Sequence, residues 1–156
     1  MINPSTLETP RLRLRPLELS DTSAIQRAAS AREIADTMIS LPHPYPAGEA
    51  DRYVARLEVE REAGHSVAFA IDHQMDDTFC GLVEIRKINR EHSQGEVSFW
   101  LTAETGGQGY WLVVFKAVLR FGLVTLCLIR FYQEHIYRNT ADRRVRVKYG
   151  FCQDGL

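Results

Sequence analysis

The chain has 156 residues, a net charge of −1 and 45% hydrophobic residues. This is the size and composition of one globular domain with a single core. A charge so close to zero gives no basic field of the kind that binds nucleic acid or an anionic membrane, so neither is expected as a partner. The apolar stretch at 111–128 is interrupted by Lys116, Arg120 and Gly122, which favours a buried helix running into a strand over a membrane span.

The cysteines and histidines show no spacing typical of a metal site. Cys80, Cys127 and Cys152 are odd in number and match no zinc or Cys-x-x-Cys pattern, which favours a reducing, cytoplasmic location. Cys127 lies in an apolar run and is expected in the core. No metal site is expected, and the first residues do not resemble a signal peptide.

The first third of the chain is predicted to form a strand and two helices. Arg11-Leu-Arg-Leu-Arg15 alternates strictly, which predicts a strand ended by Pro16. One helix follows the cap candidates Ser20-Asp21, and a second follows a proline-rich loop at 41–46 and ends at Gly64. The expected apolar stripes are Ile25, Ala28, Ala29 and Ile34 in the first helix, and Ala50, Tyr53, Val54, Leu57 and, more weakly, Val59 in the second.

The rest of the chain is predicted to form an antiparallel meander of strands and then a crossover. A β-loop-α-β crossover joins parallel strands. The sequence therefore predicts one α+β domain over residues 1–156, with a mixed, mostly antiparallel sheet flanked by helices. The elements are strands at Ser66–Asp72, Phe79–Ile88 (with a bulge candidate at Gly81) and Gly95–Leu101, a helix at 108–123, a strand at Leu128–Tyr137 and a helix at Thr140–Tyr149.

Three glycines, Gly106, Gly107 and Gly109, stand between a predicted strand and a predicted helix. The first turn of a helix has unpaired N–H groups and a positive dipole end, so this position can bind a phosphate. No Gly-Lys-Ser/Thr follows, and the dinucleotide fingerprint is incomplete. On the glycines alone, a tight turn into a packed helix is slightly favoured over a phosphate site.

The strand before these glycines carries a carboxylate. If Val97 and Phe99 point to one face of the sheet, Glu96 points to the other, beside the phosphate candidate. A carboxylate there could act as a general base for an amine or a hydroxyl. The alternative is a solvated strand residue. Glu84, on the preceding strand, is a second candidate by the same argument.

Four stretches, in this order, resemble the GCN5-related N-acetyltransferase (GNAT) superfamily and its RimJ/RimL-like branch, the ribosomal-protein N-terminal acetyltransferases. Leu7-Glu-Thr-Pro-Arg-Leu-Arg-Leu-Arg-Pro16 is similar to the first strand of that branch. Gly95-Glu-Val-Ser-Phe-Trp-Leu101 is similar to its E-I-G-Y-W-L strand, and Gly107-Gln-Gly-Tyr110 to its G-K-G-Y loop. Asn139-Thr-Ala-Asp-Arg-Arg-Val-Arg-Val-Lys-Tyr-Gly-Phe151 is similar to its N-x-A-S-x-x-V-x-x-K-x-G-F helix.

The resemblance implies transfer of an acetyl group from acetyl-CoA to a primary amine, a protein N-terminus or a small amine, by direct attack in a ternary complex. Glu96 would take the amine proton, and a backbone amide near Val97 or Phe99 would polarise the thioester carbonyl. Asn139 would help to hold the pantetheine arm or the leaving thiol. The residues implied to bind acetyl-CoA are Gly107, Gln108, Gly109 and Tyr110 at the pyrophosphate, and Trp100, Leu101 and Thr102 along the pantetheine.

The sequence also departs from the family pattern. Glu104 stands where the wider family has Gln or Arg, Trp111 and Leu112 where the loop usually continues with a small residue and Thr, and Asp142 where Ser is usual. The family's last strand is expected to be missing after Leu156, and a homodimer is one way to complete the sheet. These departures keep an alternative open, a catalytically degenerate CoA-binding or protein-interaction module. Acceptor specificity is implied to lie around 34–53.

Overall fold

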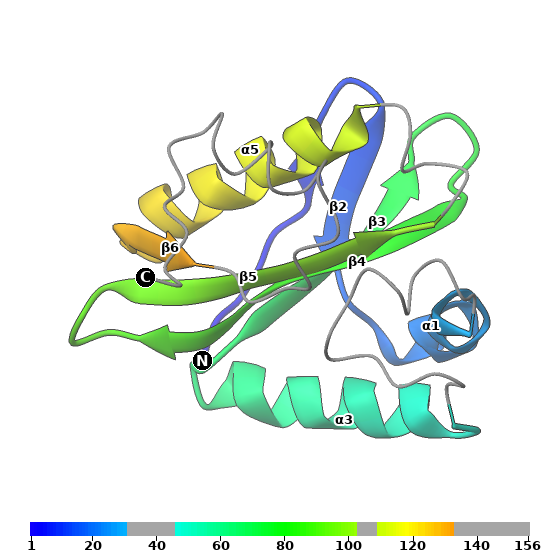
Figure 1. The fold of residues 1–156 in the computed structure, drawn as a ribbon, viewed down its shortest axis with the longest axis horizontal. Coiled ribbons are helices and arrows are strands. Elements are labelled where there is room, and N and C mark those ends of the chain that lie inside the picture. The colour runs from blue at the N-terminus through cyan, green and yellow to red at the C-terminus, as the bar shows by residue number, and fades with distance from the viewer. Residues whose placement is uncertain (31–45, 103–108, 133–156) are drawn as a thin grey trace.

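A computed structural model describes residues 1–30, 46–102 and 109–132 of the chain. In these ranges the chain forms one six-stranded sheet in the order β1-β2-β3-β4-β5-β6 (Figure 1). All neighbours are antiparallel except β5 and β6, which are parallel. The mostly antiparallel α+β sheet and its one parallel crossover are therefore confirmed. The strands are β1 (Leu7–Glu8), β2 (Leu12–Pro16), β3 (Val67–His73), β4 (Phe79–Asn89), β5 (Gln94–Leu101) and β6 (Arg130–Tyr132).

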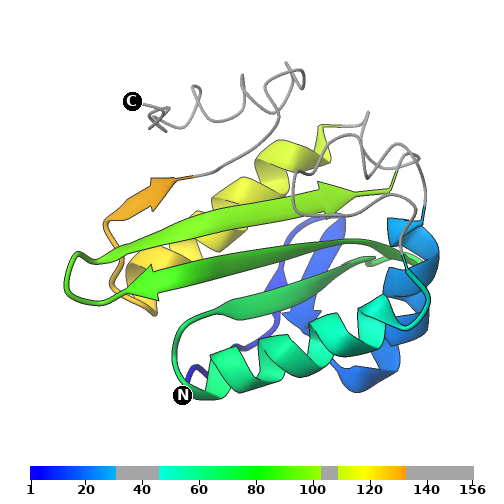
Figure 2. The same cartoon turned by 60° about the horizontal axis from the view of Figure 1, so that its bottom comes forward.

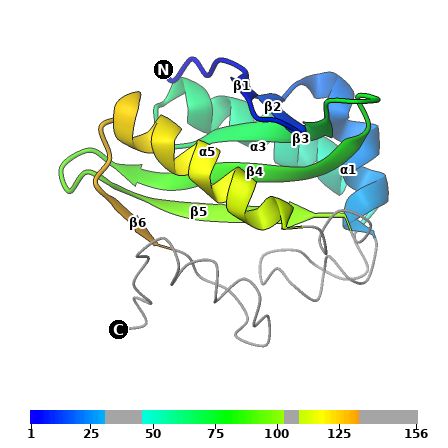
Figure 3. The ribbon, with the colours of Figure 1, turned by 90° about the horizontal axis from the view of Figure 1, so that it is seen from above.

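Helices cover both faces of this sheet. The short 3-10 helix η1 (Leu19–Asp21), α1 (Thr22–Ala29) and α3 (Glu49–Glu62) lie on one face, and α5 (Tyr110–Val124) crosses the other (Figures 1 and 2). Figure 3 shows α5 in front of the sheet, with α1 and α3 behind it. None of the helices in the described ranges is long and apolar enough to cross a membrane.

Each face of the sheet has its own apolar core, because strand side chains alternate between the faces. Val97, Phe99 and Leu101 pack in the core under α5, together with Val114 and Phe115 of that helix. Trp100 packs in the other core, which α1 and α3 cover; its members there include Ile25, Val54 and Leu82. The predicted alternation along β5 is therefore confirmed.

Two β-bulges interrupt the strand β4. Between β3 and β4, the pairing passes from Ile71 opposite Gly81 to Asp72 opposite Phe79, so Cys80 is an extra residue on β4. This bulge lies next to Gly81, as expected from the sequence. The second bulge, between Arg86 and Asn89 on the β5 side, was not predicted.

Two expectations about side-chain burial are wrong. Val59 of α3 is 67% exposed and does not join the apolar stripe of its helix, of which Ala50, Val54 and Leu57 are buried. Cys127 is exposed. The helix α5 ends at Val124, and Cys127 then adopts a left-handed conformation with φ of 57°, which leaves Leu126 and Leu128 as the buried residues of this turn.

Several predicted features lie outside the described residues. They are Ile34 and most of the proline-rich loop, Glu104 and the residues Gly106, Gly107 and Gln108 of the glycine loop, the strand beyond Tyr132, Asn139, Asp142, and the helix at Thr140–Tyr149.

Two glycines test how the sheet is packed. A Cβ at Gly81 would lie 2.4 Å from the backbone oxygen of Trp100. This oxygen belongs to the paired strand β5, so it cannot move away without disturbing the sheet. A Cβ at Gly122 would instead meet ring atoms of Phe131 at 2.6 Å, and a helical alanine recovers about 1 kcal/mol of propensity. Gly81→Ala is therefore expected to lower the free energy of unfolding by about 1–3 kcal/mol in urea titrations, and clearly more than Gly122→Ala. Equal losses would contradict this description of the bulge.

Candidate active site

The backbone of β5 faces two different neighbours in alternation. The N–H of Thr102 donates to the carbonyl oxygen of Cys80 at 2.8 Å, which directs the hydrogen-bonding groups of Thr102 toward β4. Because these groups alternate along an antiparallel strand, those of Trp100 and Ser98 also point toward β4. Those of Leu101, Phe99 and Val97 point toward the opposite edge.

That opposite edge is paired only at its start within the described residues. The strand β6 pairs with β5 from Gln94 opposite Arg130 to Glu96 opposite Tyr132. The parallel pairing of Glu96 with Tyr132 uses the outward N–H of Val97, and beyond it no described strand takes up the outward N–H and C=O groups of Phe99 and Leu101. Of the three residues expected along the pantetheine, Leu101 has this outward backbone, while the backbones of Trp100 and Thr102 face β4.

Beyond the C-terminal end of β5, the helix α5 begins at Gly109. This glycine is the N-cap, with φ of 77°, and no side chain caps the helix there in the described part of the chain. A Cβ on Gly109 would meet nothing within 4 Å, so the space in front of the first helical turn is open. The next residue, Tyr110, is buried, and its ring lies edge-on to His73 at 5.5 Å between centroids. The buried Tyr110 ring therefore fixes the start of the helix, while a Cβ at Gly109 would meet no described atom.

The unusual Trp111 takes part in the core under α5. Its ring packs edge-on to Phe99, with centroids 4.2 Å apart, and Leu112 also packs against this core. The bulk of the tryptophan is thus directed against the side chain of a β5 residue.

Glu96 is buried, although it stands on a strand near a hairpin. The residue is 4% exposed, and its Oε2 lies 3.3 Å from Lys87 Nζ and 3.6 Å from Arg86 Nε. Neither contact has hydrogen-bond geometry, and Oε2 has no hydrogen-bond partner among the described residues. The two cations balance the carboxylate charge, but its outer oxygen keeps the capacity to accept a proton. The interpretation of Glu96 as a solvated strand residue is therefore wrong.

Glu84 is buried on the same face of the sheet, where it receives a hydrogen bond from the opposite helix. The hydroxyl of Tyr53 on α3 donates to Glu84 Oε1 at 2.9 Å. Burial raises the pKa of the Glu84 carboxyl above its ordinary value of 4.5, and the Tyr53 hydrogen bond and the nearby Arg86 only partly oppose this.

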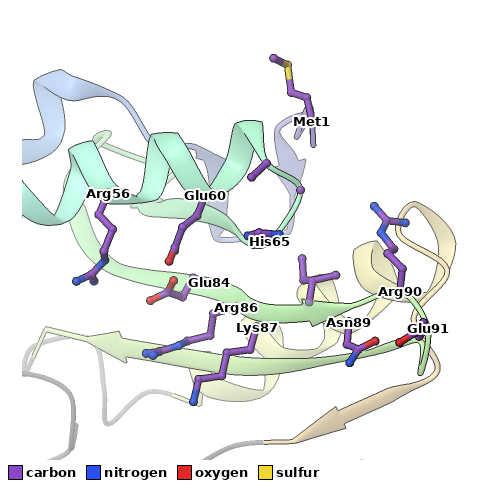
Figure 4. Close-up of a pocket in the computed structure, with 13 residues that line it drawn as sticks. Met1, Arg56, Glu60, His65, Glu84, Arg86, Lys87, Asn89, Arg90 and Glu91 are labelled. Atoms are coloured by element: carbon purple, nitrogen blue, oxygen red, sulfur yellow. The ribbon is translucent and has the colours of Figure 1, made fainter.

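A large polar cavity lies between α3 and this face of the sheet. Its volume is about 1060 Å³, and Figure 4 shows Arg56 and Glu60 of α3 pointing toward Glu84 on β4. Arg86 and Lys87, which contact Glu96, also line it. This cavity was not predicted, although the charged residues at 84 and 86 between apolar ones were a signal that this strand face meets polar surroundings. The remaining lining residues are Met1, Ala63, Gly64, His65, Ile88, Asn89, Arg90 and Glu91.

The structure therefore brings several expected residues together along one strand. Glu96 lies opposite Tyr132, the last described residue of β6, Leu101 has an outward-facing backbone, and Gly109 is the N-cap of the helix that follows. The side chain of Trp100 is buried under α1 and α3, against Phe79. Gly107, Gln108 and Asn139 lie outside the described residues. No group of His, Cys, Asp and Glu side chains in the described ranges could hold a metal ion.

Comparison with known proteins identifies the family. The family model of the acetyltransferase (GNAT) domain matches residues 11–152, which is most of the chain. The chain therefore belongs to the GNAT acetyltransferase family. It is an N-acetyltransferase, and acetyl-CoA is the acetyl donor of this class. A search of curated proteins gave no match.

Solved structures with the same fold include members of the branch expected from the sequence. The ribosomal L7/L12 alpha-N-protein acetyltransferase RimL, in complex with coenzyme A, superposes with a TM-score of 0.83 at 16% identity, over 92% of this chain and 82% of that chain. RimJ of Mycobacterium smegmatis, in complex with CoA-disulfide, gives 0.81 at 19% identity, over 94% and 75%. Spermidine N-acetyltransferase of Vibrio cholerae, with CoA and spermine, gives 0.78 at 21% identity, over 91% and 81%. All three share the fold of this chain.

The buried Glu84 makes a prediction about pH. Because its pKa is raised on folding, the folded chain binds this proton more tightly than the unfolded chain. The stabilisation from this proton is complete below pH 4.5 and is lost as the pH rises through the higher folded pKa. Glu84→Gln is neutral at every pH and can still accept the Tyr53 hydrogen bond. Its free energy of unfolding is expected to match the wild type near pH 4 and to exceed it increasingly toward pH 8. The exposed control Glu62→Gln should show no such trend; a parallel trend in both would contradict the assignment.

Proposed function

We propose that this enzyme transfers the acetyl group of acetyl-CoA to the primary amine of a protein N-terminus or of a small molecule, by direct attack in a ternary complex. The observation that carries the proposal is Glu96, a buried carboxylate with one oxygen that accepts no hydrogen bond in the described residues. It stands on β5, where β6 stops pairing within the described ranges. A base and a strand edge that has no further partner among the described residues are thus neighbours on one strand.

The described residues fit a donor that has a phosphate group and an amide-containing arm. The N-terminal turn of α5, which no described side chain caps at Gly109, favours a pyrophosphate. The outward backbone groups of Phe99 and Leu101 are suited to hydrogen bonds with the amides of a pantetheine arm. When bound, acetyl-CoA supplies a thioester whose acetyl group can pass to a nucleophile. Gly107, Gln108 and Asn139 complete the proposed binding set, together with the neighbouring Trp100, Thr102 and Tyr110.

The proposed role of Glu96 is to take the proton of the attacking amine. An amine attacks only when its nitrogen has a lone pair, so a nearby base increases the reactive fraction. The outward N–H of Phe99 is the proposed hydrogen-bond donor to the carbonyl oxygen that gains charge during attack. The acceptor would enter from the cavity beside Arg86 and Lys87, on the sheet face opposite α5. A cytoplasmic location also belongs to the proposal, supported by the odd number of cysteines.

The first test is Glu96→Gln, which keeps the size of the side chain and removes the base. Turnover on an amine acceptor, followed by CoA release, is expected to fall by about 10²–10⁴-fold, with acetyl-CoA binding in calorimetry unchanged. The control Glu91→Gln removes an exposed carboxylate at the rim of the same cavity and should retain turnover. Binding without turnover in the wild type itself would favour the alternative of a CoA-binding module without catalysis.

Gly109→Ala tests the proposed phosphate site. The substitution puts a methyl group in front of the first helical turn and strains a backbone at φ of 77°, which costs about 1–2 kcal/mol. Acetyl-CoA affinity measured by calorimetry should fall at least about tenfold, since one hydrogen bond to a charged group is worth about 1.5–3 kcal/mol. Gly64→Ala is a matched control, because Gly64 has φ of 81° and equally open space. Gly64→Ala should lower the free energy of unfolding about as much as Gly109→Ala and leave the affinity for acetyl-CoA unchanged. Equal affinity losses in both would argue against a site at Gly109.

A further inference from the structure

Lys87 reaches Glu96 because of the second bulge in β4. By strand alternation, Lys87 would share a face with Val83 and Ile85, in the core under α5. The bulge between Arg86 and Asn89 breaks this alternation, and Lys87 adopts φ of 51°. Ile88 then takes the place in the core, and Lys87 turns to the cavity face.

This conformation is costly for a lysine. A left-handed backbone costs a residue with a Cβ about 1–2 kcal/mol, and Gly or Asn is the usual choice. Such strain is found most often where a side chain has a function. Here its result is one contact, Lys87 Nζ at 3.3 Å from Glu96 Oε2. Figure 4 shows Lys87 and Arg86 extending from β4 across β5.

Lys87 is a primary amine at the position where the proposed reaction needs one. Its side chain is 51% exposed, and its ammonium contacts the proposed base without hydrogen-bond geometry, so it is held near Glu96 and can move. Arg86 already supplies a cation 3.6 Å from the same oxygen, so charge balance alone does not require the lysine.

We propose that Lys87 is an acceptor of the enzyme itself, so that the chain acetylates its own side chain at this position. The proposal rests on the proposed function, because it uses the same donor and the same base. The Lys87 ammonium passes one proton to Glu96, and its nitrogen attacks the thioester carbon. A C–N bond forms and the C–S bond breaks. A second ammonium proton goes to the leaving thiolate, and the third stays on the amide. The product has no positive charge at this position.

The chain offers an internal control. It contains three lysines, and Lys116 is exposed on α5, across the sheet from the cavity. Uncatalysed acetylation by a thioester would modify Lys116 at least as fast as Lys87. The two sites can therefore be compared within one molecule.

The test is peptide mass spectrometry of the full chain after incubation with acetyl-CoA, sampled over time. Acetylation of Lys87 is expected to be at least about tenfold faster than that of Lys116. This difference is smaller than the rate increase of about 10²–10⁴-fold that a general base typically gives. Its rate constant should not depend on protein concentration, since the reaction is intramolecular. Glu96→Gln should slow the acetylation of Lys87 and leave the acetylation rate of Lys116 unchanged. Lys87→Arg should abolish the fast phase of acetylation.

Equal rates at the two lysines, or no effect of Glu96→Gln, would overturn the proposal. A parallel assay with an external amine as acceptor shows whether only self-acetylation fails or the proposed function fails as well. If the external amine is acetylated and Lys87 is not, self-acetylation alone is wrong. If acetyl-CoA binds and neither amine reacts, both proposals fail.

A second readout needs no acetyl-CoA. Brief treatment of the protein alone with acetic anhydride measures the accessibility of each amine. Lys87 should react more slowly than Lys116 in the wild type, because Glu96 holds its ammonium. In Glu96→Gln the difference should shrink. An unchanged ratio would show that the contact is absent in solution and would count against the proposal.

Discussion

The strand β5 contacts four neighbours, namely the apolar cores on its two faces and the strands β4 and β6 at its two edges, and the site depends on this constraint. Its odd-numbered side chains, Val97 to Leu101, fill the core under α5, while Trp100 fills the core under α1 and α3. Its backbone alternates in the same way, toward β4 and toward the opposite edge. Packing fixes the register, because a slip by one residue would exchange the two faces. The outward backbone groups of β5 and the buried Glu96 are therefore held in place by the cores on both sides.

Burying two carboxylates beside an apolar core works against stability. An ionised group loses hydration there, and even a paired buried charge often contributes less than an apolar residue of similar size. The structure offsets this cost in different ways. Glu84 receives a hydrogen bond from Tyr53, and its raised pKa favours the neutral form. Glu96 has two cations nearby and no hydrogen bond to its outer oxygen in the described residues. A carboxylate that is balanced in charge but not fully hydrogen-bonded is better suited to proton transfer than to holding the fold together.

Much of the fold could be predicted from the sequence, and the limits have physical reasons. Alternation along β5 and the glycine before α5 depend on neighbours in the chain, so both could be predicted locally. The bulge at Lys87 could not, because it places Ile88 rather than Lys87 in the core under α5, against the alternation of the strand. The burial of Glu84 depends on Tyr53, on a distant helix. Cys127 was misplaced because a left-handed turn reverses the side on which one residue of an apolar run lies. Each miss comes from a contact or a backbone conformation that periodicity does not encode.

The two halves of the proposed site lie on opposite faces of the sheet. The N-terminus of α5, with Gly109, belongs to the face covered by α5, and the cavity with Arg86 and Lys87 belongs to the face covered by α3. Paired strands form a closed wall, so a donor and an acceptor could not meet through them. They could meet along β5 past Val97, where no described strand pairs with its outward side. This geometry favours direct transfer without a covalent enzyme intermediate, because nucleophile and donor approach one edge from different sides. It also gives Glu96 the main role in the proposed reaction, since any amine held beside Glu96, including that of Lys87, would face the donor.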